Sequence, residues 1–237
     1  MVSAIMVAEI GALVGDSARA NMLDALMGGQ ALTASELAWR AGVTAQTASG
    51  HLAKLTEAGL LAVARQGRHR YYRLASPLVG RMLEAVSALA SVQSPPRYRP
   101  RSRIDDALQS ARTCYDHLAG RLGVGLADAL LAKGYVVLSE DGGSTTRRGD
   151  RFFAKWGIDL AEAASQRRCF CRPCLDWSER RAHIAGALGA KLADRCFELE
   201  WIQRRKDTRA LTVTRRGVQG FESLLGFAPR RPAQLEG

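Results

Sequence analysis

Two short strings in the C-terminal half of this sequence combine cysteine with histidine, the side chains that bind soft and borderline metal ions. In "RTCYDHLAG", Cys114 and His117 are three residues apart, a spacing that places both on one face of a helix, with Asp116 beside them. In "RCFCRPCLDWSERRAHIAG", cysteines precede an aspartate and a histidine: Cys169, Cys171, Cys174, Asp176 and His183. Both strings predict chemistry carried by thiols.

A metal or metalloid site is the first such chemistry. Thiolate and imidazole together suit zinc (Zn) or a softer ion such as cadmium (Cd), lead (Pb) or copper(I), and three thiolates also suit trivalent arsenic, As(III). The candidate ligands are Cys114, His117, Cys169, Cys171, Cys174 and His183. Because the Cys-x-Cys-x-x-Cys string lacks the second paired half of a zinc ribbon, companion ligands must come from distant sequence. We expect no organic cofactor.

A thiol redox switch is the second interpretation. Arginines flank the thiols in the sequence, and nearby positive charge lowers a thiol pKa and makes the thiolate reactive toward oxidants. These arginines are Arg167, Arg168, Arg172, Arg180 and Arg181. The third interpretation leaves the cysteines with packing roles only, which is what we expect of Cys196 in its strand-like run.

The composition is that of a globular protein with a polyanionic partner. The 237 residues are 47% hydrophobic and 24% charged, enough for one large or two ordinary domains, and the net charge is +11. The apolar N-terminal run "MVSAIMVAEIGALVGD" has no basic flank and is interrupted by Glu9, so we expect no membrane segment and a cytoplasmic protein. Five cysteines without a secretion signal favour reduced thiols over disulfides.

A change of composition divides the chain. "SVQSPPRYRPRSR" contains three prolines and four arginines, and a helix cannot continue through Pro95 and Pro96. We therefore predict an N-terminal domain over residues 1–93, a linker over 94–103 and a C-terminal domain over 104–237. The expected fold class is mainly α with small β-hairpins.

The N-terminal hundred residues read as a series of helices that ends in a hairpin. Apolar spacing predicts two helices in "AEIGALVGDSARANMLDALMGG", the second capped by Asp16 or Ser17. A short helix capped by Thr33 or Ser35, the turn "AGV" and a helix from Thr44 to about Glu57 follow. "LLAVARQGRHRYYRL" then predicts a two-stranded hairpin, and a helix over about 77–92 closes the domain.

This order positions side chains for DNA. On the helix after Thr44, Ala48, Leu52 and Leu55 face inward, which leaves short polar groups outward to reach base edges in the major groove. The basic hairpin would hold phosphates or enter the minor groove. The candidate DNA-binding residues are Thr44, Gln46, Thr47, Ser49, His51, Lys54, Arg65, Arg68, His69 and Arg70.

Residues 8 to 93 resemble the ArsR/SmtB family of bacterial winged helix-turn-helix repressors. The matching strings are "GDSARANMLDALMGG", "TASELAWRAGVTAQTASGHLAKLTEAGLL" and "RQGRHRYYRL". The resemblance implies a homodimer that pairs through its first and last helices, binds an inverted-repeat operator in double-stranded DNA and releases it when an inducer binds. It also places His51 at the edge of the packed face, near a phosphate.

Two departures from the family pattern imply that any sensor site lies elsewhere than in the family's familiar positions. The family's cysteine pair before the recognition helix is replaced by "SELAWRAG", and the last helix "SPLVGRMLEAVSALASV" has no His, Asp or Cys. Every cysteine lies beyond the linker, so a sensor that uses thiols must lie there too. Resemblance to longer members of the family favours Cys114, His117 and Cys174, with Cys169 and Cys171 as accessory residues.

The C-terminal half contains a short internal repeat. Thr146-Arg147-Arg148-Gly149 and Thr214-Arg215-Arg216-Gly217 each follow an apolar run and a polar turn, and each threonine can cap a helix. This pattern predicts two hairpin-then-helix units or a degenerate second winged helix.

The sequence therefore predicts a dimeric transcriptional repressor that is released from its operator by a metal or metalloid ion. A redox-sensing repressor, a regulator that responds to an organic ligand or to no effector, and an architectural DNA binder stay open as alternatives. We expect no enzymatic activity, because no nucleophile, base and orienting group can be identified by motif.

Overall fold

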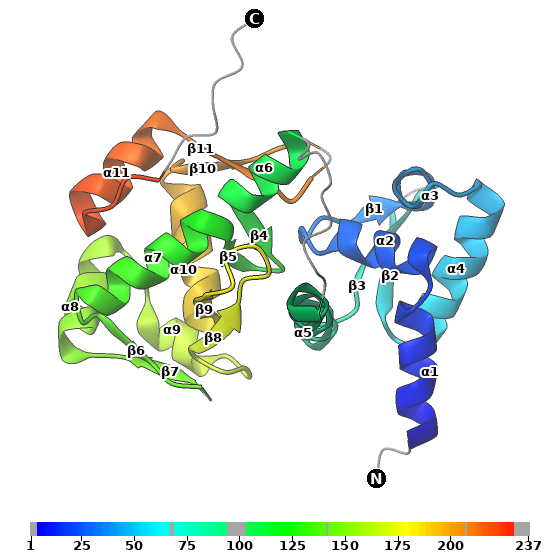
Figure 1. Cartoon of the computed structure of the whole chain (residues 1–237), viewed down its shortest axis with the longest axis horizontal. Helices are drawn as coiled ribbons and strands as arrows, with labels where there is room; N and C mark the ends of the chain where they lie inside the picture. The colour runs from blue at the N-terminus through cyan, green and yellow to red at the C-terminus, as the bar shows by residue number, and fades with distance from the viewer. Residues whose placement is uncertain (1–3, 67–68, 94–102, 141, 207, 230–237) are drawn as a thin grey trace, which may run out of the picture. The chain divides into compact units, whose positions relative to one another are not determined.

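The structure is a computed structural model, and it describes residues 4–66, 69–93, 103–140, 142–206 and 208–229. The chain divides into two compact units, residues 1–86 and 87–237 (Figure 1). The predicted linker lies outside the described residues except for its last member, Arg103, which begins a helix.

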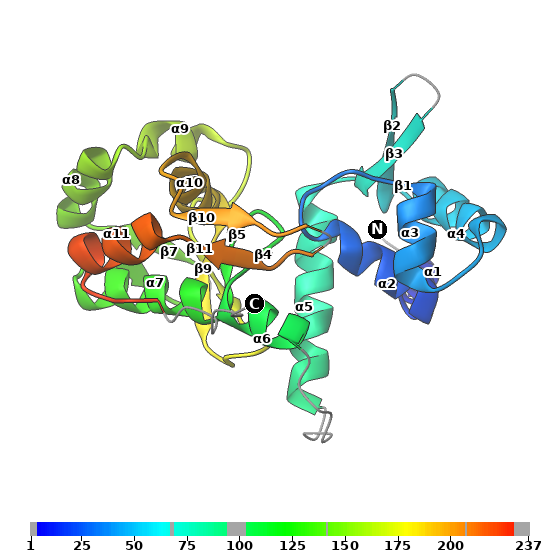
Figure 2. The same cartoon turned by 90° about the horizontal axis from the view of Figure 1, so that it is seen from above.

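The N-terminal unit combines helices with one small sheet. Its elements are α1 (Ala4–Val14), α2 (Ser17–Leu26), β1 (Leu32–Thr33), α3 (Ala34–Ala41), α4 (Ala45–Glu57), β2 (Leu61–Gln66), β3 (His69–Leu74) and α5 (Pro77–Gln93), the last of which crosses the division between the units. The antiparallel sheet has the order β1-β3-β2. Figure 2 shows the β2–β3 hairpin projecting beyond the helices of this unit.

Local capping explains the boundaries of these helices. Asp16 accepts a hydrogen bond from the Arg19 amide at the start of α2, and Thr33 forms a reciprocal capping box with Glu36 at the start of α3. Gly42 ends α3 in the left-handed conformation that glycine tolerates best, with φ of 67°. The predicted order of helices and hairpin in this unit is confirmed.

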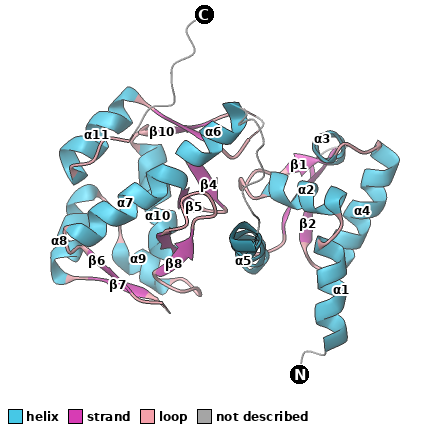
Figure 3. Ribbon diagram, viewed as in Figure 1, coloured by secondary structure: helices cyan, strands magenta, loops and turns pink. Residues whose placement is uncertain are grey.

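The C-terminal unit is built from short antiparallel hairpins that alternate with helices (Figure 3). Its first half contains α6 (Arg103–Ser110), β4 (Arg112–Cys114), β5 (His117–Ala119), α7 (Gly120–Ala132), β6 (Val136–Leu138), β7 (Gly143–Thr145) and α8 (Arg147–Trp156). Its second half contains α9 (Leu160–Ser165), β8 (Arg172–Leu175), β9 (Ala182–Ala185), α10 (Gly186–Glu198), β10 (Ile202–Arg204), β11 (Leu211–Val213) and α11 (Arg215–Leu225). The order hairpin, helix, hairpin, helix occurs twice.

The Thr-Arg-Arg-Gly strings mark equivalent points of this duplication. Thr146 caps α8 and accepts from the Gly149 amide at 3.0 Å, and Thr214 caps α11 and accepts from the Gly217 amide at 3.0 Å. A Cβ on Gly149 would lie 2.0 Å from the Tyr135 carbonyl oxygen, so only glycine allows this approach. The predicted hairpin-then-helix units are confirmed, and they belong to two copies of a longer repeat rather than to one second winged helix.

The two repeats interlock through their first hairpins and helices. Helix α7 of the first repeat packs against β9 of the second, and α10 of the second packs against β5 of the first. Gly123 and Gly189 let each of these helices lie close to the hairpin that precedes it, because a Cβ on them would lie 2.3 Å from the Leu118 carbonyl oxygen and 2.4 Å from the Ile184 carbonyl oxygen, respectively. One shared apolar core follows, with Leu122, Phe153, Leu188 and Phe221 each no more than 2% exposed.

Candidate functional site

Helix α4 presents the predicted polar surface. Ala48, Leu52 and Leu55 are fully buried on its inner side. The outward side chains are exposed: Thr44, Gln46, Thr47, Ser49 and Lys54. The helix begins at Thr44, whose hydroxyl oxygen accepts from the Thr47 amide at 3.2 Å.

His51 has a partner on α2. Its Nδ1 lies 3.2 Å from a guanidinium nitrogen of Arg19, which also donates to the carbonyl oxygens of Ala12 and Leu13. A guanidinium can only donate, so Nδ1 of His51 is the acceptor and Nε2 carries the proton. His51 is half-buried at the edge of the helix, in agreement with the position expected from the resemblance.

The hairpin β2–β3 carries the basic residues as predicted. Arg65 faces Arg70 and Gln66 faces His69 across the two strands, and all four side chains are exposed. Arg68 lies outside the described residues. Exposed arginines at the end of a projecting hairpin are suited to phosphate contacts.

A second group of candidate side chains lies in the C-terminal unit, where the two repeats meet. Cys114 and His117 face each other across the β4–β5 hairpin, and Cys174 and His183 face each other across the β8–β9 hairpin. All four side chains are buried, and their ligand atoms lie within 4.8 Å of one another. Each repeat thus contributes one thiol and one imidazole to a single group of four.

This arrangement corrects one prediction about local structure. Cys114 and His117 lie on paired strands joined by a two-residue turn, not on one face of a helix. Tyr115 in that turn has a φ of 59°, a left-handed conformation that closes a hairpin but interrupts a helix. The three-residue spacing suits both geometries, and packing against α10 selects the hairpin.

Carboxylates lie behind both imidazoles. Asp116 Oδ1 lies 3.2 Å from Nδ1 of His117, and Asp176 Oδ2 lies 3.3 Å from Nδ1 of His183. The Nε2 atoms of the two histidines approach each other at 3.1 Å. Both rings therefore direct Nε2 toward the interior of the cluster.

Each carboxylate is in turn paired with an arginine. Asp176 accepts from Arg112 at 2.9 Å in a fully buried ion pair and from the Gly120 amide at 2.6 Å. Asp116 pairs with Arg168, which also donates to the Gly186 carbonyl oxygen at 2.6 Å. From the sequence we assign no role to the two carboxylates or to Arg112, and we expect Arg168 to act on the thiols, because the ion-pair partners are distant along the chain.

Hydrogen bonds, burial and ion pairs set the electrostatics of the cluster. The hydrogen bond with Cys174, and then burial, raise the pKa of the Cys114 thiol above its usual value. Burial acts to raise the pKa of Asp176, but His183 and Arg112 outweigh it and hold that pKa well below its usual range. The predicted lowering of thiol pKa concerned Cys169, Cys171 and Cys174, and it is wrong for Cys171, whose thiol pKa is raised by burial. Arg168, one of the arginines expected to act on these thiols, pairs with Asp116 instead.

The remaining cysteines lie outside the cluster. Cys169 is exposed and its thiol donates to the Cys171 carbonyl oxygen at 3.3 Å. Cys171 is buried in the apolar core, and burial raises the pKa of its thiol to about 12. Cys196 is buried as expected, but on α10 rather than on a strand.

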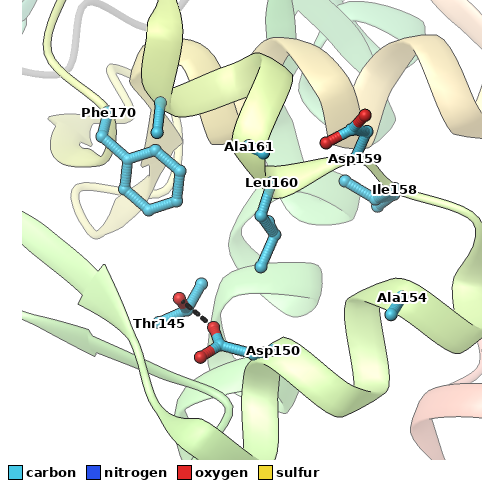
Figure 4. Close-up of a pocket in the computed structure, with 9 residues that line it drawn as sticks. Thr145, Asp150, Ala154, Ile158, Asp159, Leu160, Ala161 and Phe170 are labelled. Atoms are coloured by element: carbon cyan, nitrogen blue, oxygen red, sulfur yellow. Dashed lines mark hydrogen bonds between the residues drawn. The ribbon is translucent and has the colours of Figure 1, made fainter.

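An open pocket lies elsewhere in the C-terminal unit, with a volume of about 650 Å³. Figure 4 shows Leu160 and Phe170 on one side of it and Asp150 with Thr145 on the other. The Thr145 hydroxyl donates to Asp150, so part of the polar lining is already satisfied within the protein. None of the four clustered Cys and His residues lines it.

Among the described residues, no helix is both long and apolar enough to span a bilayer.

Comparison with known proteins agrees with this architecture. Residues 14–64 match the family model described as a helix-turn-helix domain. An uncharacterized HTH-type transcriptional regulator of Bacillus subtilis, YdfF, is 43% identical over 219 residues, which cover 92% of this chain and 96% of that protein.

Two solved structures are similar to part of this chain. One is the homodimeric winged helix-turn-helix DNA-binding domain of a possible ArsR-family regulator from Mycobacterium bovis, with 27% identity, 41% of this chain and 89% of that chain covered, and a TM-score of 0.36. The other is NolR from Sinorhizobium fredii, which is 27% identical in sequence. That match covers 36% of this chain and 85% of the NolR chain, with a TM-score of 0.34. Because the similarity to YdfF extends over nearly the whole of both chains, the protein belongs to the HTH-type transcriptional regulators, and its N-terminal unit is the winged helix-turn-helix domain that the ArsR/SmtB resemblance predicted.

Proposed function

We propose that the protein is a homodimeric repressor of the ArsR type whose affinity for an inverted-repeat operator is set by a metal ion bound in the C-terminal unit. The observation that carries this proposal is the cluster of Cys114, His117, Cys174 and His183, all buried and with ligand atoms within 4.8 Å of one another. Two thiols and two imidazoles are a donor set that zinc and cadmium prefer.

The surface of α4 supports specific recognition of DNA. Gln46, Thr47 and Ser49 are exposed near the start of the helix, where a recognition helix contacts base edges in the major groove. Arg65 and Arg70 on the hairpin would bind phosphates, and His51 would donate from Nε2 to a phosphate oxygen.

Exposed apolar residues on α1 support a homodimer. Helix α1 buries none of its residues within the chain, and Ile5, Met6 and Val7 are 71%, 54% and 63% exposed. On α5, Leu78 and Leu89 are 65% and 60% exposed. Apolar helix faces of this kind are typical of a surface that a second copy covers.

An ion can act on DNA binding only if it favours one conformation of the dimer over another. The ligands come from both repeats, so their coordination would draw the two first hairpins together in one fixed arrangement. We expect that arrangement to favour a dimer in which the two α4 helices no longer match the half-site spacing. For a site of this kind, a coupling free energy of about 1–3 kcal/mol is typical.

The test is binding of the reduced, metal-free protein to DNA from upstream of its own gene, measured by fluorescence anisotropy. Zinc, cadmium, lead, arsenite and peroxide are added in separate titrations. We expect release by one of the ions, and no release by that ion from the Cys174→Ser protein. Cys169→Ser is the matched control, because its thiol is exposed and outside the cluster, and it should respond like the unchanged protein.

Other outcomes would select the alternatives. Release by peroxide alone would identify a thiol switch, for which the contact between Cys114 and Cys174 is the relevant observation. Binding that no addition changes would reject metal sensing and direct attention to an organic ligand of the 650 Å³ pocket or to no effector. A steep salt dependence without sequence preference would indicate an architectural protein.

A further inference from the structure

We propose that the cluster is a tetrahedral site for a divalent ion of the zinc class, in which Asp116 and Asp176 are positioning residues, and that it does not select trivalent arsenic. This inference rests on the proposed function and specifies its ion.

The protonation of the two rings follows from their neighbours. Asp116 is paired with Arg168 and Asp176 with Arg112, so both carboxylates are held as anions that can only accept hydrogen bonds. The Nδ1 atom of His117 donates to Asp116 and is therefore the protonated one, so Nε2 of His117 directs a lone pair toward Nε2 of His183, 3.1 Å away. The two Nε2 atoms are within hydrogen-bond distance of each other, and a cation between them would take the place of the proton that they share.

The distances suit a tetrahedral ion. Zinc bound to nitrogen at about 2.0–2.1 Å and to sulfur at about 2.3 Å separates two nitrogens by about 3.3 Å and two sulfurs by about 3.8 Å. The two Nε2 atoms lie 3.1 Å apart, and all four ligand atoms fall within 4.8 Å of one another. Small side-chain adjustments would bring the four groups to ideal separations, without movement of the strands that carry them.

The carboxylates supply the outer shell that such sites require. A metal-bound histidine almost always donates its other ring nitrogen to a carboxylate, carbonyl or water, which fixes the ring and raises its basicity. Here each histidine has an aspartate of its own repeat behind it, Asp116 for His117 and Asp176 for His183. Asp176 is paired with Arg112 of the other repeat, and Asp116 is paired with Arg168 from the segment before β8. The two sides differ in one respect: Nδ1 of His117 forms a hydrogen bond with Asp116, whereas Nδ1 of His183 lies 3.3 Å from Asp176 without forming a hydrogen bond.

Trivalent arsenic would need a third thiolate. Only Cys114 and Cys174 belong to the cluster. Cys171 lies in the large apolar core, where a Cβ on Gly143 would be 2.9 Å from its sulfur, and the exposed Cys169 thiol donates to a backbone carbonyl. The site therefore offers two sulfurs and two nitrogens, which suits zinc, cobalt(II) and cadmium.

The experiment is a titration of the full-length, reduced, metal-free protein with cobalt(II), followed by visible and near-ultraviolet absorption. We expect one cobalt per chain, the intense visible bands of tetrahedral coordination and a thiolate-to-cobalt band. Zinc should bleach these bands, and equimolar arsenite should not. Cys174→Ser should lose intensity in the thiolate band.

Asp116→Asn tests the positioning role, because Asp116 is partly exposed and its loss leaves the fully buried Arg112–Asp176 pair intact. We expect a 10- to 100-fold weaker affinity for cobalt with shifted visible bands, at unchanged circular dichroism. Asp128→Asn is the matched control, because Asp128 pairs with Arg181 on the surface, and it should bind cobalt like the unchanged protein.

Weak octahedral bands, displacement of cobalt by arsenite, or an Asp116→Asn protein with unchanged affinity and spectrum would each overturn the inference. These results are separable from the test of function. Arsenite-dependent release of DNA together with octahedral cobalt would retain a sensing repressor and reject this site. Tetrahedral cobalt bound by a protein whose operator affinity never changes would retain the site and reject its regulatory role.

Discussion

Arg112 and Asp176 form an ion pair of 2.9 Å in which both side chains are fully buried, although one belongs to the first repeat and the other to the second. The guanidinium also lies 4.4 Å above the Trp177 ring, and the carboxylate accepts from the Gly120 amide and lies next to His183. The pair therefore joins the duplicated halves at the position where the thiols and imidazoles meet.

Removal of one partner of this pair should destabilise the C-terminal unit strongly. Arg112→Ala leaves the Asp176 carboxylate buried without its cation, a change that typically costs about 3–5 kcal/mol of unfolding free energy. The measurement is urea denaturation followed by tryptophan fluorescence. Arg181→Ala removes the exposed partner of Asp128 and should cost less than about 1 kcal/mol. Equal losses for the two variants would contradict a special role for the buried pair.

Gly149 and Gly217, each in the first turn of α8 or α11, should not tolerate a side chain. A Cβ on Gly217 would lie 2.1 Å from the Trp201 carbonyl oxygen, so Gly217→Ala must displace the hairpin β10–β11 from the helix. We expect a loss of unfolding free energy of about 1–3 kcal/mol, as for other overpacking changes. Gly11→Ala is the control, because nothing lies within 4 Å of its Cβ position, and an unfolding midpoint no lower than that of the unchanged protein is expected.

Substitutions on α4 and on the hairpin should have different effects on DNA binding. Gln46→Ala removes a group placed for base contacts, so we expect about 1–3 kcal/mol weaker binding to the operator and relaxed preference at one base pair. Arg70→Ala removes a proposed phosphate contact, so it should weaken binding to all sequences alike and lower the salt slope by about one. Anisotropy titrations at several salt concentrations, on operator and scrambled DNA, distinguish the two. Similar behaviour of both variants would argue against the assigned roles.

The thiols should differ widely in reactivity. Cys169 is exposed and should be alkylated first by iodoacetamide. Burial raises the pKa of Cys171 to about 12, so at a pH of about 8 only on the order of 10⁻⁴ of that thiol is ionised, and it should react slowly. Peptide mass spectrometry over time measures each site. Rapid modification of Cys171 in folded protein would be inconsistent with this structure.

The apolar face of α1 should control the oligomeric state. Ile5→Arg places a charge on a side chain that is 71% exposed in the single chain, so the fold should be retained while association is lost. Sedimentation velocity should show a monomer, with a large loss of operator affinity because two half-sites can no longer be bound together. Val137→Glu is the control on an exposed apolar residue of β6, and it should remain a dimer.

The sequence by itself determined the N-terminal unit, because its structure rests on local interactions. The caps at Asp16, Thr33 and Thr44, the turn at Gly42 and the apolar spacing of α4 act within a few residues of one another. These signals gave the order of helices and hairpin, the inward face of α4 and the exposed polar residues near its start. They required no knowledge of distant contacts.

The sequence predicted only part of the repeat in the C-terminal half. Thr-Arg-Arg-Gly marked the second hairpin and helix of each copy, since a threonine cap and a glycine at a close approach are local requirements. The spacing of Cys114 and His117 was ambiguous, because three residues separate neighbours on a helix as well as partners across a tight hairpin.

Among the six candidate ligands, the family resemblance favoured Cys114, His117 and Cys174, and only the tertiary structure decided that His183 joins them in one cluster. The interlocking of α7 with β9 and of α10 with β5 brings Cys114 and His117 to Cys174 and His183, and the same strands direct Cys171 into the apolar core. It also makes Arg168, which the sequence suggested as an activator of thiols, the partner of Asp116. Side chains of residues distant along the chain meet through packing, and packing geometry is what a linear pattern of residue types does not contain.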